Sequence, residues 1–127
     1  MSRWWIIFAV AGIIFAQEPK PEEGQLPPEE DKAEIPKQYS FNPLQSKKEV
    51  IVGDFYFKKG DYKGAALRFA SATKWNDANA EAWLKLGETR EKQQDAKGAR
   101  EAYERYLQLA PDGKNALEVK KRLEKLK

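Results

Sequence analysis

From position 46 onward the sequence repeats itself with an offset of 34 residues. Residues 61–65 (DYKGA) align with residues 95–99 (DAKGA). The same offset pairs Gly53 with Gly87, Val52 with Leu86, Phe69 with Tyr103 and Lys58 with Lys92. A fixed period of this length in a helix-forming composition indicates one helical unit stacked on a copy of itself. The repeat therefore restricts the folded part of the chain to an all-α array.

Residue sizes within the repeat predict how each unit packs. Small residues stand where two antiparallel helices would approach closely, at Gly53, Ala65, Gly87 and Ala99. Larger residues at the spacing of a buried helix face would fill the space between the helices, and these are Val52, Tyr56, Phe69, Leu86 and Tyr103. Each unit is therefore expected to be a helical hairpin.

Capping residues indicate the ends of the expected helices. Asn42 followed by Pro43 is typical of a helix start, and Asp61 and Asp95 are suited to cap the second helix of each unit. Gly60 suits the left-handed turn that closes a helix. We expect helices over residues 44–59, 62–75, 80–93, 96–109 and 114–126.

This arrangement resembles the tetratricopeptide repeat (TPR) family, whose pattern is W-x2-L-G-x2-Y, then A-x3-F, then P. The second unit, residues 80–113, matches with Trp83, Leu86, Gly87, Ala99, Tyr103 and Pro111. The first unit, residues 46–79, matches with Val52, Gly53, Tyr56, Ala65 and Phe69. The departures are Glu49, Asp77 and Arg90. The resemblance implies an all-α, TPR-like helical-hairpin solenoid of two repeats plus a C-terminal capping helix.

Residues 114–127 are the expected capping helix. Ala116, Val119, Leu123 and Leu126 lie on one helical stripe, and Lys121 stands where the repeats have their close-packing glycine. A terminal unit with a polar outer face keeps a solenoid soluble. Because two repeats and a cap make a minimal array, self-association is an alternative.

The TPR resemblance implies a concave face, lined by the first helix of each unit, that holds a partner peptide or helix. The groove positions carried over are Lys47, Val50, Asp54, Phe57 and Lys58 in the first unit. In the second unit and the capping helix they are Glu81, Leu84, Glu88, Glu91, Lys92, Glu118, Arg122 and Lys125. An apolar stripe of Val50, Phe57 and Leu84, rimmed by mixed charge, favours an amphipathic or mixed-charge ligand over a polyanion.

Other interpretations of this face follow from the residues. TPR domains that grip the C-terminal carboxylates of chaperones use Lys and Asn where this chain has Val50 and Asp54, and an acid there would repel a carboxylate. Residues 39–44 of the same chain, or a second copy, are alternative covers for the apolar stripe. We expect an external protein or peptide partner and keep self-coverage and a structural homo-oligomer as alternatives.

Residues 1–16 have the pattern of a secretory signal peptide. Arg3 gives a positively charged start, residues 4–16 (WWIIFAVAGIIFA) are apolar, and Gln17 begins a polar segment. This apolar run is short for a bilayer core of about 30 Å. We therefore expect cleavage after Ala16 and export to the periplasm or the extracellular space. Ile14 departs from the small-residue rule for cleavage, and an uncut N-terminal membrane anchor is the alternative.

Residues 17–45 are expected to form a disordered linker rich in Pro and Glu with a short apolar end. They carry seven acidic residues against three lysines, and residues 17–38 hold five of the seven prolines. Such a segment buries too little apolar surface to offset its chain entropy. Tyr39, Phe41 and Leu44 form the apolar end, which we expect to cover the open first face of the array.

Composition and charge limit the functions of the chain. It has no Cys and no His, which excludes thiol and imidazole catalysis, disulfides and Cys/His zinc sites. Glu88 and Glu91 stand one helical turn apart on an expected exposed face, whereas acid–base catalysis needs contrasting, partly buried carboxyls. We therefore expect no enzyme activity, no cofactor and no metal site.

The folded part is mildly basic. Residues 46–127 carry nineteen Lys and Arg against thirteen Asp and Glu, within a net charge of +3 for the chain. We expect no nucleic-acid binding, because this charge is small and no recognition motif is present. A basic run near the C-terminus raises the alternative of weak contact with an anionic envelope surface, through Lys120, Lys121, Arg122 and Lys125.

Overall fold

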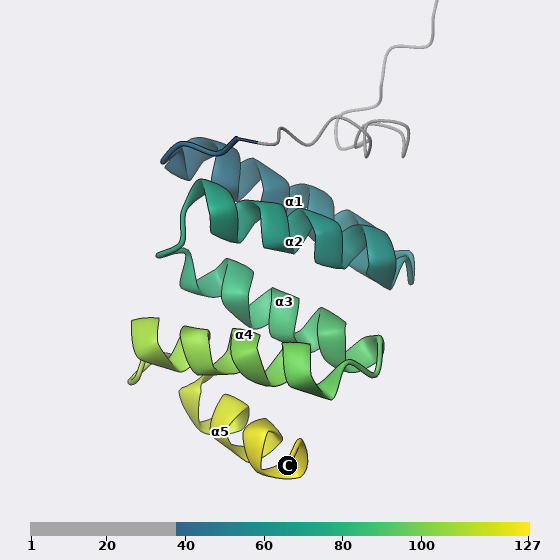
Figure 1. Ribbon diagram of the computed structural model, residues 1–127, viewed down its shortest axis with the longest axis vertical. Helices are drawn as coiled ribbons and strands as arrows, with labels where there is room; N and C mark the ends of the chain where they lie inside the picture. Colours follow the sequence, from purple (N-terminus) through teal and green to yellow (C-terminus); the bar gives the residue numbers. More distant parts are fainter. Residues whose placement is uncertain (1–37) are drawn as a thin grey trace, which may run out of the picture.

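The computed structural model describes residues 38–127, and the secondary-structure elements in this part of the chain are all α-helices (Figure 1). The helices are α1 (Pro43–Lys58), α2 (Tyr62–Trp75), α3 (Ala80–Lys92), α4 (Ala96–Leu109) and α5 (Ala116–Lys125). The predicted all-α class is confirmed. The helices predicted over 62–75 and 96–109 match α2 and α4 at both ends, and the other three differ by one or two residues at an end.

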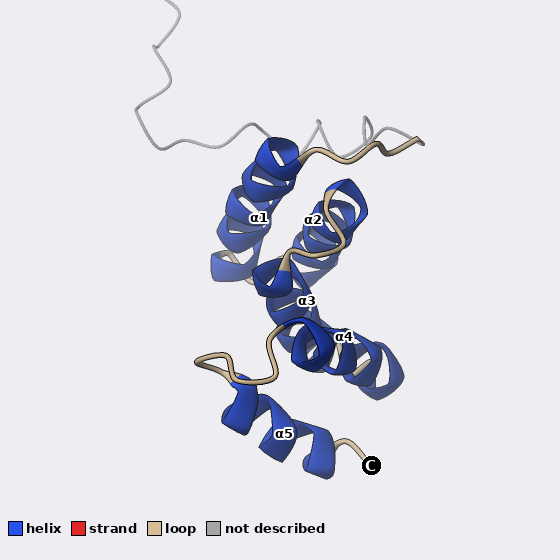
Figure 2. Cartoon of the chain, turned by 90° about the vertical axis from the view of Figure 1, so that its left-hand side faces the viewer, coloured by secondary structure: helices blue, strands red, loops and turns tan. Residues whose placement is uncertain are grey.

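The helices stack in chain order as two hairpins and a single last helix. α1 packs on α2, α3 packs on α4, and α2 joins the two hairpins through its contact with α3. Figure 2 shows α1 and α5 on the left, α2 and α4 on the right, and α3 between them. The first helices of the units therefore line one side of the array, as the TPR resemblance implies.

Each helix start has a physical cause in the sequence. The Asn42 side chain accepts a hydrogen bond from the Gln45 backbone N–H at 3.0 Å, and Pro43 occupies the first turn of α1. Asp61 and Asp95 accept from the N–H groups three residues later, both at 2.9 Å. The predicted caps are confirmed, and they fix where α1, α2 and α4 begin.

The turns inside the two hairpins have the same backbone path with different residues. Gly60 has a φ of 80°, as predicted for a left-handed turn, and the position 34 residues later is Gln94 with a φ of 60°. A non-glycine residue rarely adopts this conformation. In both turns the next residue, Asp61 or Asp95, donates its backbone N–H at 2.9 Å, to the carbonyl of Tyr56 or Arg90 respectively. The repeat therefore preserves backbone geometry even where it loses the glycine.

One close approach at a glycine holds the two helices of each hairpin together. A Cβ atom added at Gly53 would lie 2.5 Å from the Phe69 ring, and one added at Gly87 would lie 2.5 Å from the Tyr103 ring. Both rings are fully buried. The prediction that glycine allows these helices to approach is confirmed, because any side chain there would displace a core aromatic.

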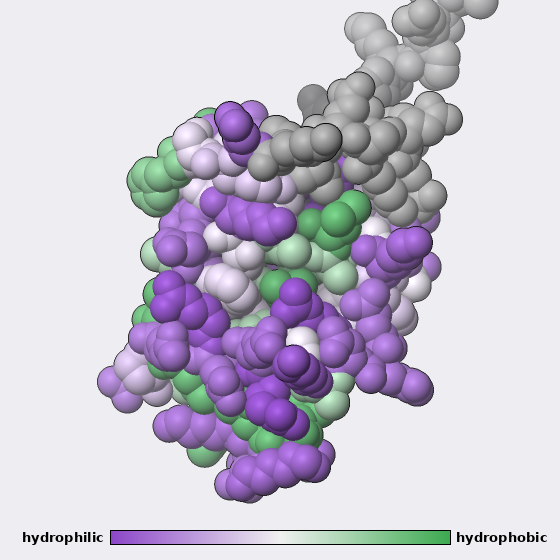
Figure 3. All heavy atoms as spheres, in the orientation of Figure 1, coloured by the Kyte–Doolittle hydropathy of each residue, from purple (hydrophilic) through white to green (hydrophobic). Residues whose placement is uncertain are grey.

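α5 closes the array with its apolar stripe turned inward. Ala116 and Val119 are buried, and Leu123 and Leu126 pack against the cluster that Tyr103 and Tyr106 form on α4. Figure 3 shows hydrophilic side chains over much of one face, with smaller apolar patches between them, including some near the α4–α5 end. The predicted stripe is confirmed, although the helix begins at Ala116, two residues later than expected.

The segment before α1 does not cover the first face of the array, so that expectation is wrong. Phe41 is 77% exposed and Leu44 is 64% exposed. Tyr39 instead packs edge-on against Trp75 at the end of α2, with ring centroids 4.9 Å apart. The cause is the helix start at Pro43, which places Leu44 in the first turn on the solvent side.

The expected signal peptide (residues 1–16) and most of the expected linker lie outside the described residues. Within residues 38–127, no helix has the length and apolar character needed to cross a membrane.

Candidate binding groove

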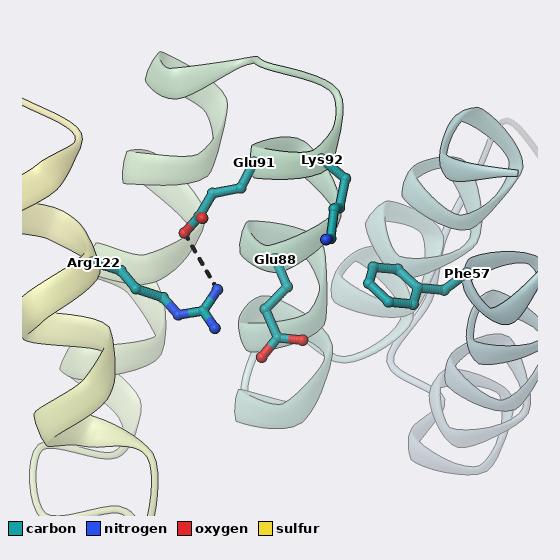
Figure 4. A pocket seen from close by; sticks show the side chains of 5 residues that line it. All are labelled: Phe57, Glu88, Glu91, Lys92 and Arg122. Atoms are coloured by element: carbon teal, nitrogen blue, oxygen red, sulfur yellow. Dashed lines mark ion pairs between the residues drawn. The ribbon is translucent and has the colours of Figure 1, made fainter. Parts of the chain in front are cut away.

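A line of adjoining hollows follows the side of the array formed by α1, α3 and α5; we call it the groove. The central hollow, of about 360 Å³, is lined by Phe57 of α1, Arg122 of α5, and Glu88, Glu91 and Lys92 of α3 (Figure 4). Its walls therefore come from α1, α3 and α5, which lie side by side only because the hairpins and the capping helix stack.

Three further hollows extend the groove. The α1 hollow, of about 300 Å³, is lined by Asp54, Phe57, Lys58, Phe69, Lys85 and Glu88. The α4 hollow, of about 460 Å³, is lined by Ala80, Glu81, Leu84, Lys85, Glu88, Tyr106, Ala110 and Asn115. The α5 hollow, of about 390 Å³, is lined by Glu91, Glu118, Lys121, Arg122, Lys125 and Leu126. Glu88 lines the central, α1 and α4 hollows and so stands at the middle of the groove.

On one side of Glu88, a lysine joins the two repeats. The Lys85 ammonium of α3 lies 2.6 Å from the Asp54 carboxylate of α1 and 3.9 Å from the Glu81 carboxylate. All three side chains are partly exposed, so the energy of each pair is small, about 0–1 kcal/mol. The pairs nevertheless fix where charge lies along the groove wall.

On the other side of Glu88, an arginine joins α5 to the second repeat. The Arg122 guanidinium lies 2.9 Å from the Glu118 carboxylate and 3.6 Å from the Glu91 carboxylate, and it donates to the Tyr103 hydroxyl at 3.3 Å. The Glu118 contact, together with these neighbours, raises the pKa of Arg122, so the guanidinium remains charged. Burial and the neighbouring Glu91 carboxylate raise the pKa of the Tyr103 hydroxyl.

Glu88 differs from the other groove carboxylates. Burial in the hollow raises its pKa, and the nearby cations Arg122 and Lys85 only partly oppose that effect. Within the described part of the chain Glu88 takes part in no ion pair within 4.0 Å. Its charge is thus partly desolvated and lacks a direct counter-ion there.

Eleven of the thirteen predicted groove residues line the four hollows. They are Asp54, Phe57, Lys58, Glu81, Leu84, Glu88, Glu91, Lys92, Glu118, Arg122 and Lys125. Val50 is 5% exposed and belongs to the core between the hairpins, so the predicted apolar stripe is reduced to Phe57 and Leu84. Lys47 is exposed on α1 but lines none of the four hollows.

The prediction omitted Lys85, which lines two hollows and pairs with both repeats. One sequence signal was available, because Glu81 and Lys85 have opposite charges at the i, i+4 spacing of neighbours on a helix. The basic run on α5 divides between two environments: Lys120, Lys121 and Lys125 are exposed, whereas Arg122 is tied to acidic residues in the groove. In the described residues no group of three or more acidic side chains is arranged to hold a metal ion.

A tetratricopeptide repeat family model matches residues 56–123, which is more than half of the chain. The chain belongs to the tetratricopeptide repeat family. The match covers the second helix of repeat one, all of repeat two and most of the capping helix, in register with the helices of the structure. No curated protein matches the chain in a sequence search. The TPR solenoid predicted from the period of 34 residues is therefore confirmed, and TPR repeats are generally non-catalytic modules for protein–protein interaction.

Proposed function

We propose that this TPR protein is an exported adaptor that binds a peptide or helix of a partner protein in the groove along α1, α3 and α5. The observation that carries the proposal is the continuous line of hollows, in which Phe57 and Leu84 offer apolar surface and charged side chains form the rim. A concave apolar surface with a few placed polar groups is a typical binding site. Membership of the TPR family supports a protein as the partner.

Export is part of the same proposal and rests on the sequence of residues 1–16. The mature protein should have an intact mass that starts at Gln17. Recovery of Met1 on the protein isolated from its host would instead favour the uncut membrane anchor.

The groove is tested by capture in the native host. The tagged full-length chain is expressed there, crosslinked and purified, and co-purifying proteins are compared with those of the Phe57→Ala/Leu84→Ala double variant. A matched control is Leu67→Ala/Leu117→Ala, which removes two exposed leucines on α2 and α5 outside the hollows. A partner enriched by wild type and control but lost with the groove variant supports the proposal. Equal capture by a folded groove variant contradicts it.

A structural homo-oligomer is the second candidate, and the first face of the array favours it. Leu86 of α3 is buried at the junction with the first hairpin, whereas its equivalent in α1, Val52, has no preceding hairpin among residues 38–127. Leu44 and Ile51 of α1 are also exposed. A mass that rises with protein concentration in sedimentation experiments would favour this candidate.

A further inference from the structure

Building on the proposed groove, we infer that Glu88 receives a lysine or arginine side chain of the bound peptide, with the ring of Phe57 beside its aliphatic part. The partner segment is therefore defined by one basic residue flanked by apolar ones. The inference rests on the proposed function and specifies which partner chemistry the groove selects.

The distribution of charge in the groove leaves Glu88 as the open position. Lys85 already contacts two carboxylates, those of Asp54 and Glu81, and Arg122 likewise contacts two. Each resident cation therefore lies within 4.0 Å of its own carboxylates and acts on Glu88 only from a greater distance. Within the described residues, Glu88 is left as the groove carboxylate that has no ion pair within 4.0 Å and so can take a new one.

The surroundings of Glu88 suit a basic side chain in particular. Figure 4 shows the Glu88 carboxylate within the central hollow, between Phe57 on one side and Arg122 on the other. Lys and Arg side chains carry an aliphatic stem that packs on apolar surface and a charged end that pairs with a carboxylate. An aromatic ring also attracts a cation over its face. The hollow therefore offers a partner for both parts of one side chain.

Burial of the Glu88 charge is unfavourable in the free protein, and pairing with a basic ligand side chain would reduce that cost. Burial in the central hollow partly deprives the charged form of Glu88 of water, and this raises its pKa. A ligand cation would restore a favourable environment for that charge, whereas an apolar ligand group would bury it further. The central hollow thus selects against a purely apolar segment.

Lys92 is the resident group that competes for the same position. It stands four residues after Glu88, is exposed and lines the central hollow, yet it forms no ion pair with Glu88. An acidic ligand residue would need to bind Lys92 and Lys58 at the rim instead. Removing the charge of Glu88 should therefore weaken binding of a basic ligand residue, and removing the charge of Lys92 should weaken binding of an acidic one.

The test begins with a displayed library of random peptides, selected on the protein purified as its host makes it. The expected peptides carry Lys or Arg at one fixed position beside apolar residues and lose binding to Phe57→Ala/Leu84→Ala. For one synthetic peptide of this set, Glu88→Gln is expected to raise Kd about tenfold. Lys92→Gln is expected to lower Kd by a factor of about two to three, because a repulsive charge is removed. Glu104→Gln, an exposed acid of α4 outside the hollows, is the matched control and should leave Kd unchanged.

Exchange of the charges identifies the contact itself. The Glu88→Lys variant should reject the basic peptide and bind a peptide whose basic residue is replaced by Glu. Thermal melting of each variant shows that the fold is kept.

The outcomes separate this inference from the proposed function. Peptides that need Phe57 and Leu84 but carry no fixed basic residue, or that ignore Glu88→Gln, overturn the inference and leave the groove as the binding site. Selected peptides with a fixed acidic residue overturn it as well and point to Lys58 and Lys92. If no selected peptide depends on Phe57 and Leu84, the groove proposal fails and the inference fails with it.

Discussion

The two repeats have the same helical-hairpin backbone but differ in the side chains that pack between their helices. Gly53 lies against Phe69 in the first hairpin as Gly87 lies against Tyr103 in the second. The departures from the TPR pattern fall at other positions. In the first repeat, Glu49 stands where the second has Trp83, and both are in the first helix of their hairpins.

A second difference accompanies the first. Glu49 is buried and lies 3.3 Å from the Arg68 guanidinium of α2. The residue 34 positions after Arg68 is Ala102, which is fully buried in the cluster on which Trp83 packs. The first repeat thus uses an ion pair between its helices where the second uses a large apolar residue next to a small one. At this position the two facing residues differ together between the repeats, so each hairpin keeps a complementary pair between its helices.

The position of the family tyrosine also differs between the repeats. Tyr56 is fully buried in the first repeat, and the second has Arg90 in its place. The Arg90 guanidinium donates to the carbonyl of Gly98 at 3.0 Å, so its charge is hydrogen-bonded to the start of α4. A residue that departs from the pattern is therefore supplied with a new partner.

The largest expected effect comes from breaking the pair in the first repeat. Arg68→Ala leaves the Glu49 carboxylate buried without its cation, because the two side chains are only 10% and 7% exposed. Loss of one partner of such a pair costs about 3–5 kcal/mol. Urea unfolding should show this loss in the free energy of unfolding.

A double substitution tests whether the repeats are interchangeable. Glu49→Trp combined with Arg68→Ala recreates the Trp83 and Ala102 combination of the second repeat and should recover most of the lost stability. Glu49→Trp alone should remain destabilised, since Arg68 is then buried without a carboxylate. A loss below about 1 kcal/mol for Arg68→Ala would show that the pair contributes no more than a surface ion pair.

A smaller effect is expected at the close approaches that the repeats have in common. Gly53→Ala and Gly87→Ala each place a methyl group 2.5 Å from a buried ring. Overpacking of about 1–3 kcal/mol exceeds the gain of about 1 kcal/mol from better helix propensity. Both variants should therefore be destabilised by similar amounts, up to about 2 kcal/mol, in urea unfolding.

The third position of this register supplies the control. Lys121 of α5 is exposed, and Lys121→Ala should change the free energy of unfolding by less than about 0.5 kcal/mol. If only one of Gly53→Ala and Gly87→Ala is destabilised, the two hairpins do not share one packing.

Most of the fold could be predicted because it depends on local signals and on the period. Asn42, Asp61 and Asp95 cap their helices through hydrogen bonds to residues only three positions away, so the local sequence is enough to predict them. The 34-residue offset identifies which positions of the two repeats are equivalent. The start of α5 was predicted two residues too early, because Asn115 makes no side-chain capping bond and residues 114 and 115 stay outside the helix.

The groove was predictable as a face but not as a charge arrangement. The TPR resemblance placed Phe57, Leu84 and Glu88 on one side, whereas the burial of Val50 depends on how the two hairpins dock. The bond between Lys85 and Asp54 joins residues 31 positions apart, and no pattern along one helix reveals it. Long-range docking therefore sets the parts of the site that sequence spacing misses.

The smallest expected effect contrasts two equivalent carboxylates of the groove. Asp54 and Glu88 are 34 positions apart, but Asp54 lies 2.6 Å from Lys85 while the pKa of Glu88 is raised by burial. Asp54→Asn should lower the free energy of unfolding at neutral pH, and Glu88→Gln should raise it. Each change should be below about 1 kcal/mol, because both side chains are partly exposed and screened by water.

The pH dependence gives the sign for Glu88. Its folded pKa is above the unfolded value of 4.5, so ionisation opposes folding at any pH above the folded pKa. That penalty fades as the pH falls through the folded pKa and is gone below 4.5. The advantage of Glu88→Gln over wild type, measured by urea unfolding, should therefore be present at pH 7 and fade at pH 4. An advantage that persists unchanged at pH 4 would mean that the amide gains contacts of its own, and the two repeats would then differ in packing and not in charge at this position.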